Sequence, residues 1–412
     1  MKSSRSGNSQ DASNFTPPLP TAHSPLPALS HSPLPSFPVL GYTSLPGMNA
    51  GLSTLARNGV RRMSRTVAEL AALVQGELHG DAEVLIHDVA ALDCVNPQTL
   101  TFLDNARRLR RLEGLTPGAL IIPADAVESA RKVTSCPLIA VADPQGAFIE
   151  VMLHFRPLAA RETSGISSQA LIHPTARIGS GTNVHNNAVI EADVVIGANC
   201  DIHAGVVIRR GCVLGDDVTL HPNTVLYPGM QLGHRVIIHA NAVIGADGFG
   251  YRFQQGRFIR IPHTGIVRIE DDVEVGSCTT IDRAMVGETV IGAGSKIDNL
   301  VMIAHNCRIG KHNAFASQVG FAGSITTGDY VRCAGQVGVA DHIKIGDRAT
   351  LGAKSGVMVD IEAGTTQLGA PCLPDKEQFR IMLATHRLPE LVKRVTELEQ
   401  KLAALEPAKR AA

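Results

Sequence analysis

An aliphatic side chain recurs at every sixth position through much of this 412-residue chain, and this period limits the possible folds more than any other feature. The first run holds thirteen consecutive aliphatic positions, from Ile172 to Ile244. After an interruption the phase resumes, shifts once by four residues, and then continues from Ile291 to Val357, where only Thr327 is clearly polar. So long a repeat predicts a repetitive architecture.

A period of six matches neither the α-helix nor the two-residue alternation of a strand. It predicts a parallel β-helix in which each hexad forms one short strand and one turn, and three hexads close a triangular coil of 18 residues. The aliphatic residue points inward, and small residues allow the tight corner. Roughly nine coils, at about 4.8 Å per stacked strand, give a prism on the order of 45 Å tall. The low aromatic content of 4% suits so narrow a core.

The repeat divides the chain into four predicted regions. Residues 1–62 are rich in Pro and Ser, and such a segment is expected to be disordered because it buries too little apolar surface. An alternative is that translation starts at Met63. Residues 63–165 predict a small α/β domain, residues 166–370 the β-helix, and residues 371–412 a C-terminal helix.

Two local patterns support the outer regions. Thr66 and Glu69 have the spacing of a capping box, so a helix should begin there. Short apolar runs at 84–86, 119–122 and 138–141 predict strands.

In the tail, apolar residues alternate three and four apart, which predicts pairing with copies of the chain in preference to packing within it. These positions are Leu388, Leu391, Val395, Leu398, Leu402 and Leu405. With the three flat faces of the prism, they predict a homotrimer.

Composition excludes several classes of protein. The 38 basic and 38 acidic side chains balance, which argues against a nucleic-acid partner. No stretch approaches the roughly 18 apolar residues of a transmembrane helix. The eight cysteines form no CxxC pair, so a reduced, cytoplasmic protein is expected.

The two interruptions of the repeat are where we expect a site, because irregular loops on a rigid scaffold commonly carry function. The first interruption spans 245–264 and begins with the sequence GADGFGY. The second surrounds Asp282 and Arg283, and the sequence Ile-Ala-His-Asn follows at 303–306.

With these motifs, and with TTIDR at 279–283 and TFLDN at 101–105, the chain resembles the lipid A N-acyltransferase family, the UDP-3-O-(3-hydroxyacyl)glucosamine N-acyltransferases. The resemblance covers roughly residues 63–405. It implies a left-handed β-helix and transfer of a 3-hydroxyacyl chain from acyl carrier protein to the 2-amino group of a UDP-3-O-acylglucosamine. It implies no metal or redox cofactor.

By this resemblance His305 is the general base that takes a proton from the attacking amine, a task that imidazole performs well near neutral pH. Gly323 lies 18 residues further on, which places it one coil above His305, and it matches the family's oxyanion donor. Asp298 and Asn306, beside His305 in the motif, are assigned to substrate contact or to orienting His305. His342 matches a second family histidine that positions substrate.

The resemblance also implies a uridine site in the N-terminal domain. Phe102, Asn105 and Arg108 follow one another at intervals of three. The family usually has Tyr at the third position, whereas this chain has Arg108. A guanidinium stacks on a base and carries positive charge toward the diphosphate.

One pattern has no family explanation. His185, His203, His221 and His239 are spaced by one coil each and should form a column along one edge of the prism. Neighbours about 5 Å apart in one column do not converge as a tetrahedral zinc site requires, so a surface ladder is favoured over a metal site.

Three alternative functions use the same scaffold. A UDP-N-acetylglucosamine O-acyltransferase would lack the N-terminal domain. A zinc carbonic anhydrase would need histidines that converge across a subunit interface. A non-enzymatic scaffold would lack the GADGFGY and IAHN motifs. We therefore favour the N-acyltransferase.

Overall fold

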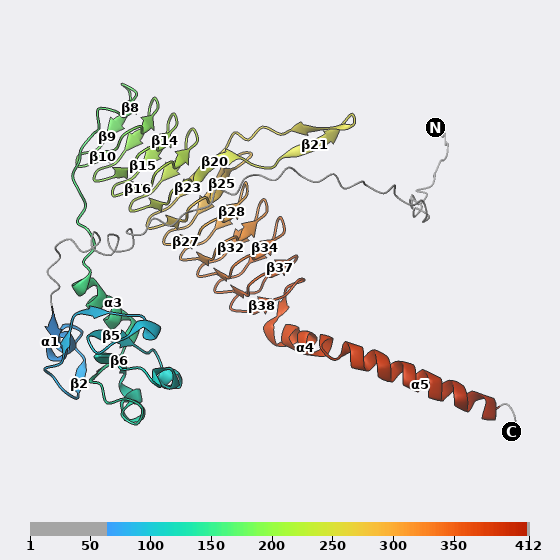
Figure 1. Ribbon diagram of the computed structural model, residues 1–412. Helices are drawn as coiled ribbons and strands as arrows, with labels where there is room; N and C mark the ends of the chain where they lie inside the picture. Colours follow the sequence, from blue (N-terminus) through green and yellow to red (C-terminus); the bar gives the residue numbers. More distant parts are fainter. Residues whose placement is uncertain (1–63, 410–412) are drawn as a thin grey trace, which may run out of the picture. The chain divides into compact units, whose positions relative to one another are not determined.

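The computed structural model describes residues 64–409 (Figure 1), so the expectation for residues 1–62 lies outside the described part of the chain. The chain divides into two compact units between Leu158 and Ala159. Across the described residues, no helix is both long enough and apolar enough to span a membrane.

The N-terminal unit contains a five-stranded sheet with the strand order β2-β7-β6-β5-β4. The predicted capping box at Thr66 and Glu69 is present and begins α1. The predicted strands correspond to β3, β6 and β7. The elements of this unit are β1 Arg65–Thr66, α1 Val67–Leu73, β2 Glu77–His79, β3 Leu85–Ile86, β4 Asp88–Val89, η1 Leu92–Cys94, β5 Thr99–Phe102, η2 Ala106–Leu112, β6 Ala119–Pro123, η3 Ala124–Ala126, α2 Val127–Ala130, β7 Leu138–Val141 and α3 Pro144–Phe155.

The second unit is a left-handed parallel β-helix, built from three sheets of 11, 10 and 9 strands (Figure 1). The hexads predict the parallel β-helix, and the resemblance implies its left hand. Sheet 1 holds β10 Asn183–Val184, β13 Asp201–Ile202, β16 Thr219–Leu220, β19 Ile237–Ile238, β24 Glu274–Val275, β27 Lys296–Ile297, β30 Ala314–Phe315, β33 Arg332–Cys333, β36 Thr350–Leu351, β38 Thr366–Leu368 and β39 Leu373–Pro374. Sheet 2 holds β8 Leu171–Ile172, β11 Val189–Ile190, β14 Val207–Ile208, β17 Val225–Leu226, β20 Val243–Asp247, β25 Thr280–Arg283, β28 Met302–Ile303, β31 Gly320–Phe321, β34 Gly338–Val339 and β37 Gly356–Val357. Sheet 3 holds β9 Arg177–Ile178, β12 Val195–Ile196, β15 Val213–Leu214, β18 Gln231–Leu232, β23 Ile266–Ile269, β26 Glu288–Ile291, β29 Arg308–Ile309, β32 Thr326–Thr327 and β35 Lys344–Ile345.

The core of the β-helix contains two buried positions in most hexads. Ile208 is fully buried, as the period predicts, and so is Val206, two residues before it. Cysteines occupy this second position at Cys212 and Cys307, where each thiol donates to a backbone carbonyl. Burial raises the pKa of Cys212 to about 11 and that of Cys307 to about 12. These thiols are therefore core residues and not nucleophiles.

The corners of the prism explain two recurrent residue types. The residue three positions after the inward aliphatic has a positive φ, as at Asn187, Asn199 and Asp217, and Asn and Asp tolerate this conformation better than most side chains. At the corner after sheet 3, glycines stack on one another: a Cβ on Gly215 would lie 2.7 Å from the Gly233 carbonyl carbon. Glycine is needed at this corner because the backbones of neighbouring coils are in contact.

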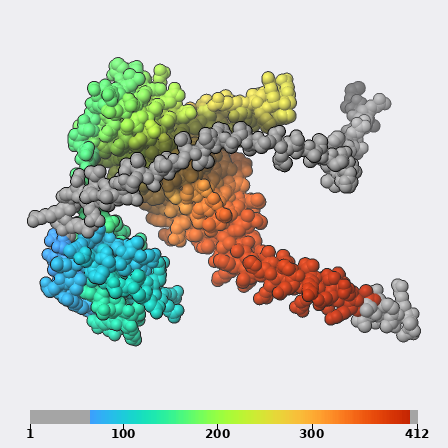
Figure 2. All heavy atoms as spheres, viewed as in Figure 1, coloured from blue at the N-terminus to red at the C-terminus, as the bar shows by residue number. Residues whose placement is uncertain are grey.

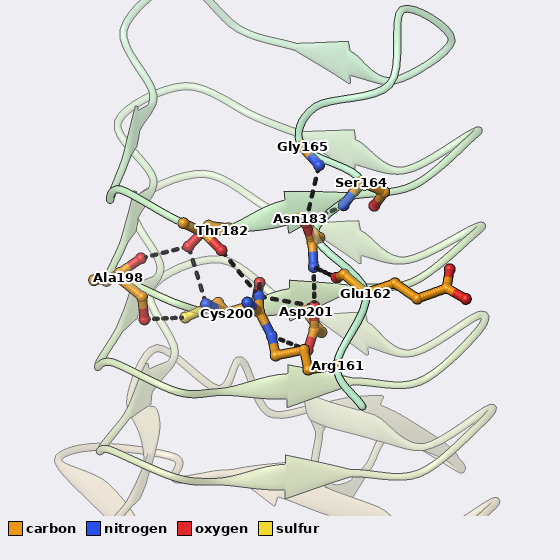
Figure 3. Close-up of polar contacts among 11 residues, drawn as sticks. Arg161, Glu162, Ser164, Gly165, Thr182, Asn183, Ala198, Cys200 and Asp201 are labelled. Carbon is orange, nitrogen blue, oxygen red and sulfur yellow. Dashed lines mark hydrogen bonds and ion pairs between the residues drawn. The ribbon is translucent and has the colours of Figure 1, made fainter. Parts of the chain in front are cut away.

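The first coil is closed by the segment that precedes it (Figure 3). Arg161 makes a two-pronged ion pair with Asp201 at 2.7 and 2.9 Å. The buried Asn183 accepts the backbone N–H groups of Ser164 and Gly165 and donates to Asp201 at 2.6 Å. These contacts occupy hydrogen-bonding groups that the first coil would otherwise leave unpaired.

The first interruption of the repeat forms a hairpin of β21 Tyr251–Gln254 and β22 Arg257–Arg260. The space-filling view shows it in yellow, projecting from the β-helix (Figure 2). Its aromatic side chains are largely exposed. The segments before and after the hairpin lie beside His305, through Gly248 and His263.

The tail forms α4 Asp375–Thr385 and α5 Leu388–Lys409. Five residues of the predicted seam, from Leu388 to Leu402, are between 46% and 63% exposed. These five side chains are not buried by the described part of the chain, and the predicted pairing with other copies stays a prediction.

Candidate active site

His305 follows β28 at the end of sheet 2, and Gly323 lies one coil above it. The register pairs Ile303 with Phe321, and Ser324 N–H donates to the His305 carbonyl at 2.9 Å. A Cβ on Gly323 would lie 2.7 Å from His305 Cε1 and 2.8 Å from Nε2. Only glycine therefore leaves this side of the imidazole open.

Asn306 determines which His305 nitrogen carries the proton. Asn306 Oδ1 accepts Met285 N–H at 3.0 Å, while Asn306 Nδ2 donates to the Val286 carbonyl at 3.0 Å, so both ends of the amide are assigned. His305 Nδ1 lies 3.2 Å from the same Oδ1 and must donate to it. In the neutral imidazole the remaining nitrogen, Nε2, then carries the free lone pair, and it faces Gly323.

His263 is a site residue that sequence reasoning missed. It ends the hairpin insertion, is 6% exposed, and its ring centroid lies 5.2 Å from that of His305 in an edge-to-face arrangement. Gly248 of the GADGFGY loop fits between the two rings, because a Cβ there would lie 2.7 Å from His305 Cδ2 and 2.9 Å from His263 Nε2. The sequence signal that could have identified His263 is its place as a histidine at the end of the first insertion.

A charged cluster lies below His305, with Asp282 and Arg283 one coil away and Asp247 two coils away. Asp247 pairs in register with Arg283 and forms an ion pair with Arg260 of the hairpin. Asp282 is buried, at 4% exposure. Burial, with the nearby carboxylate of Asp247, raises the pKa of Asp282 to about 7. This carboxyl is therefore protonated below about pH 7.

Two other predicted residues do not converge with His305 as closely. Asp298 follows β27 of sheet 1, so it lies at a different corner of the prism, and its carboxylate accepts Asn299 N–H at 2.7 Å. His342 lies above Gly323, whose carbonyl accepts His342 N–H at 3.0 Å. The His342 side chain is 76% exposed. Within one chain, Asp298 has no contact with the His305 ring.

In the N-terminal unit, Phe102 and Arg108 line a cavity of about 440 Å³ together with Phe148, Arg111 and Arg156. The Phe102 and Phe148 rings lie 4.7 Å apart. The Arg108 guanidinium forms an ion pair with Asp104 at 3.3 Å and is half exposed.

Asn105 is not among the residues that line this cavity. Its amide donates to Asp104 at 3.0 Å, and the residue immediately precedes η2. Phe102 and Arg108 therefore line the same cavity, whereas Asn105 does not belong to its lining.

The four predicted column histidines do stack along one edge of the β-helix. Successive ring centroids lie 4.9, 5.1 and 4.9 Å apart with nearly parallel planes. Among residues 64–409 no group of three or more His, Cys, Asp or Glu side chains is arranged to hold a metal ion. Stacked rings do not converge on a point, and the ladder interpretation is the one that the geometry supports.

The bacterial transferase hexapeptide model matches residues 175–210 and 211–246 of the β-helix, which places the chain among the hexapeptide transferases. The model described as UDP-3-O-(3-hydroxymyristoyl) glucosamine N-acyltransferase matches residues 83–154. A relative from Syntrophus aciditrophicus, named UDP-3-O-acylglucosamine N-acyltransferase, is 48% identical over 84% of this chain and 94% of its own. One of the same name from Nitratidesulfovibrio vulgaris is 51% identical over 83% of this chain and 98% of its own. The chain belongs to the UDP-3-O-acylglucosamine N-acyltransferase family, and it is an acyltransferase.

Solved structures also align with part of this chain. The UDP-N-acetylglucosamine acyltransferase of Bacteroides fragilis aligns with a TM-score of 0.40 and 23% identity, covering 51% of this chain and 73% of that one.

Proposed function

We propose that the chain transfers a 3-hydroxyacyl group from acyl carrier protein to the 2-amino group of a UDP-3-O-acylglucosamine, as a step of lipid A biosynthesis in the cytoplasm. The observation that carries this proposal is the free Nε2 of His305 opposite Gly323, in a chain of this family. No metal or redox cofactor takes part.

In the proposed step the sugar amine attacks the thioester carbonyl. A nitrogen–carbon bond forms, the carbon–sulfur bond breaks, and His305 Nε2 accepts one amine proton and returns it to the leaving thiolate. Gly323 N–H has no acceptor among the described residues. This unpaired donor is available to the developing oxyanion. Asn306 keeps His305 in the tautomer that the step requires.

The substrate's nucleotide is proposed to bind in the cavity of the N-terminal unit, where Phe102 offers an aromatic face and Arg108 a planar cation. His342 and Asp298 are proposed to contact substrate. Within one chain, Asp298 and His305 lie at different corners of the prism, so they do not bind the substrate together.

Replacing His305 by Ala tests the proposal. We expect turnover to fall by about 10²–10⁴-fold, the usual contribution of a general base, while circular dichroism stays that of the parent. The matched control is His312→Ala, which removes an exposed histidine elsewhere on the β-helix. Near-normal turnover of His305→Ala would refute the assignment.

The acceptor and donor need a separate assay. The purified chain is offered UDP-3-O-acylglucosamine or UDP-N-acetylglucosamine, each with acyl carrier protein thioesters of graded length. Transfer to the second sugar alone would favour the O-acyltransferase alternative.

A further inference from the structure

His263 carries a buried nitrogen with no hydrogen-bond partner. Its Nδ1 lies 3.0 Å from the Ile261 carbonyl and must donate to it, so Nε2 is an acceptor. Nε2 is buried and unpaired, a state shared among the described side chains only with Arg283 Nε. A buried polar atom without a partner destabilises the folded chain. A donor that arrives with a ligand would remove this penalty.

The unpaired nitrogen is directed at the candidate active site. The space occupied by a Cβ on Gly248 would lie 2.9 Å from His263 Nε2 and 2.7 Å from His305 Cδ2, the atom bonded to the base nitrogen. This position also lies 2.8 Å from His305 Cβ, so His263 Nε2 and the His305 ring flank the same turn. The backbone of Gly248 lies between them. The turn that carries it has glycine at 248 and 250, and the side chain between them, Phe249, is 86% exposed.

The chemistry of the nucleophile supplies the missing donor. A neutral amine has two N–H groups and one lone pair, whereas a hydroxyl has a single O–H. When the lone pair attacks the carbonyl, one N–H of the amine is directed at the general base and the other still needs an acceptor. A site built for an amine therefore needs two acceptors, and a site built for a hydroxyl needs one.

We propose that His263 is a substrate-binding residue whose Nε2 accepts the second N–H of the attacking amine, and that this contact selects nitrogen over oxygen nucleophiles. The Gly248 turn moves outward to admit the amine. His305 Nε2 takes the first proton, and the second N–H stays on the nitrogen, bonded to His263, in the amide product. The inference rests on the proposed function, since it assigns a role in that reaction.

Two variants and two sugar nucleotides test it. His263→Leu removes the acceptor at similar volume, while His263→Gln places an amide oxygen close to the position of Nε2. The second nucleotide is the analogue in which a hydroxyl replaces the 2-amino group. For each protein, kcat/KM is measured with the amine and the dissociation constant with both nucleotides. Circular dichroism verifies the fold.

We expect His263→Leu to lower kcat/KM for the amine by about 10- to 100-fold, an effect typical of an unpaired polar contact. Its dissociation constant for the amine should rise while that for the hydroxyl analogue stays within about twofold. His263→Gln should recover most of the activity. Equal losses for both nucleotides, or equal behaviour of the two variants, would overturn the inference. A parent protein that acylates no amine would instead overturn the proposed function.

Discussion

Histidines illustrate how position determines the task of a residue in this chain. His305 has one nitrogen fixed by Asn306 and the other free beside a glycine. His203 is stacked between two other imidazoles, and burial together with the nearby His185 holds its pKa below the usual value. The same side chain is thus a candidate base at one corner and part of a surface ladder at another.

Arg108, where the chain departs from its family, is predicted to bind the nucleotide. Arg108→Ala should raise the KM for the sugar nucleotide about fivefold to a hundredfold, because stacking on a base contributes roughly 1–3 kcal/mol. The value of kcat should change little, since a remote contact stabilises ground and transition states alike.

The matched variant is Arg108→Tyr, which restores the usual family residue and should retain or improve binding. If both variants bind the nucleotide as the parent does, Arg108 is a solvated residue, and its ion pair with Asp104 is its only function.

Asp282 should make folding stability depend on pH. Its pKa is about 7 in the folded chain against an ordinary value of 3.8. Between about pH 4 and 7 the folded chain keeps a proton that the unfolded chain has released, so stability falls as the pH rises through this range and levels off above it. The slope reaches at most about 1.4 kcal/mol per pH unit.

Asp282→Asn removes this dependence. Its Tm, measured by calorimetry, should exceed that of the parent by more at pH 8 than at pH 5. A difference between the two proteins that is the same at both pH values would contradict the account.

At the scale of the element, the hexad is the unit of stability. Each strand is only two residues long in most coils, so no strand is stable alone. Stacking neighbours supplies both the backbone hydrogen bonds and the continuous core. Substitutions at the stacked corner should therefore disturb two coils at once.

Gly215→Ala tests this at the glycine corner. Its Cβ would lie 2.7 Å from the backbone of Gly233, so the coils must separate, and we expect a loss of about 1–3 kcal/mol. Gly338→Ala is the control, because no atom lies within 4 Å of its Cβ. The control should be neutral or raise stability by up to about 1 kcal/mol. Thermal unfolding followed by circular dichroism compares them, and equal Tm values would contradict the prediction.

At the scale of the whole molecule, the exposed seam of α5 is the feature that a single chain leaves unexplained. Its apolar residues are spaced three and four apart and lie in solvent. Such a stripe is stabilised when helices from several chains pair. Together with the flat faces of the β-helix, it supports the predicted homotrimer.

Replacing Leu391 and Leu398 by Glu should weaken the trimer by placing charges in the seam, while the β-helix keeps its circular dichroism. Light scattering should report the parent as a trimer at micromolar concentration and the variant as smaller species upon dilution. The control is Glu397→Lys, which changes a charge outside the seam. A monomeric parent would refute the homotrimer.

The sequence alone determined the β-helix, because each coil must bury an aliphatic side chain at the same place and the six-residue period records that requirement. It also determined that Gly323 lies over His305, since 18 residues return the chain to the same corner. The second buried position, occupied by Val206 and Cys212, is not apparent from the sequence because alanine, cysteine and valine alternate there and do not form one class of side chain.

Only the tertiary structure decided which residues join His305. Asp298 is seven residues from His305 in the sequence but follows a strand of a different sheet, whereas His263 is 42 residues away and its ring contacts that of His305. The hairpin insertion brings His263 back to the corner, and no repeat period describes the path of an insertion. The path is determined by Gly248 and Gly250, which fit against the two imidazoles because they have no side chain.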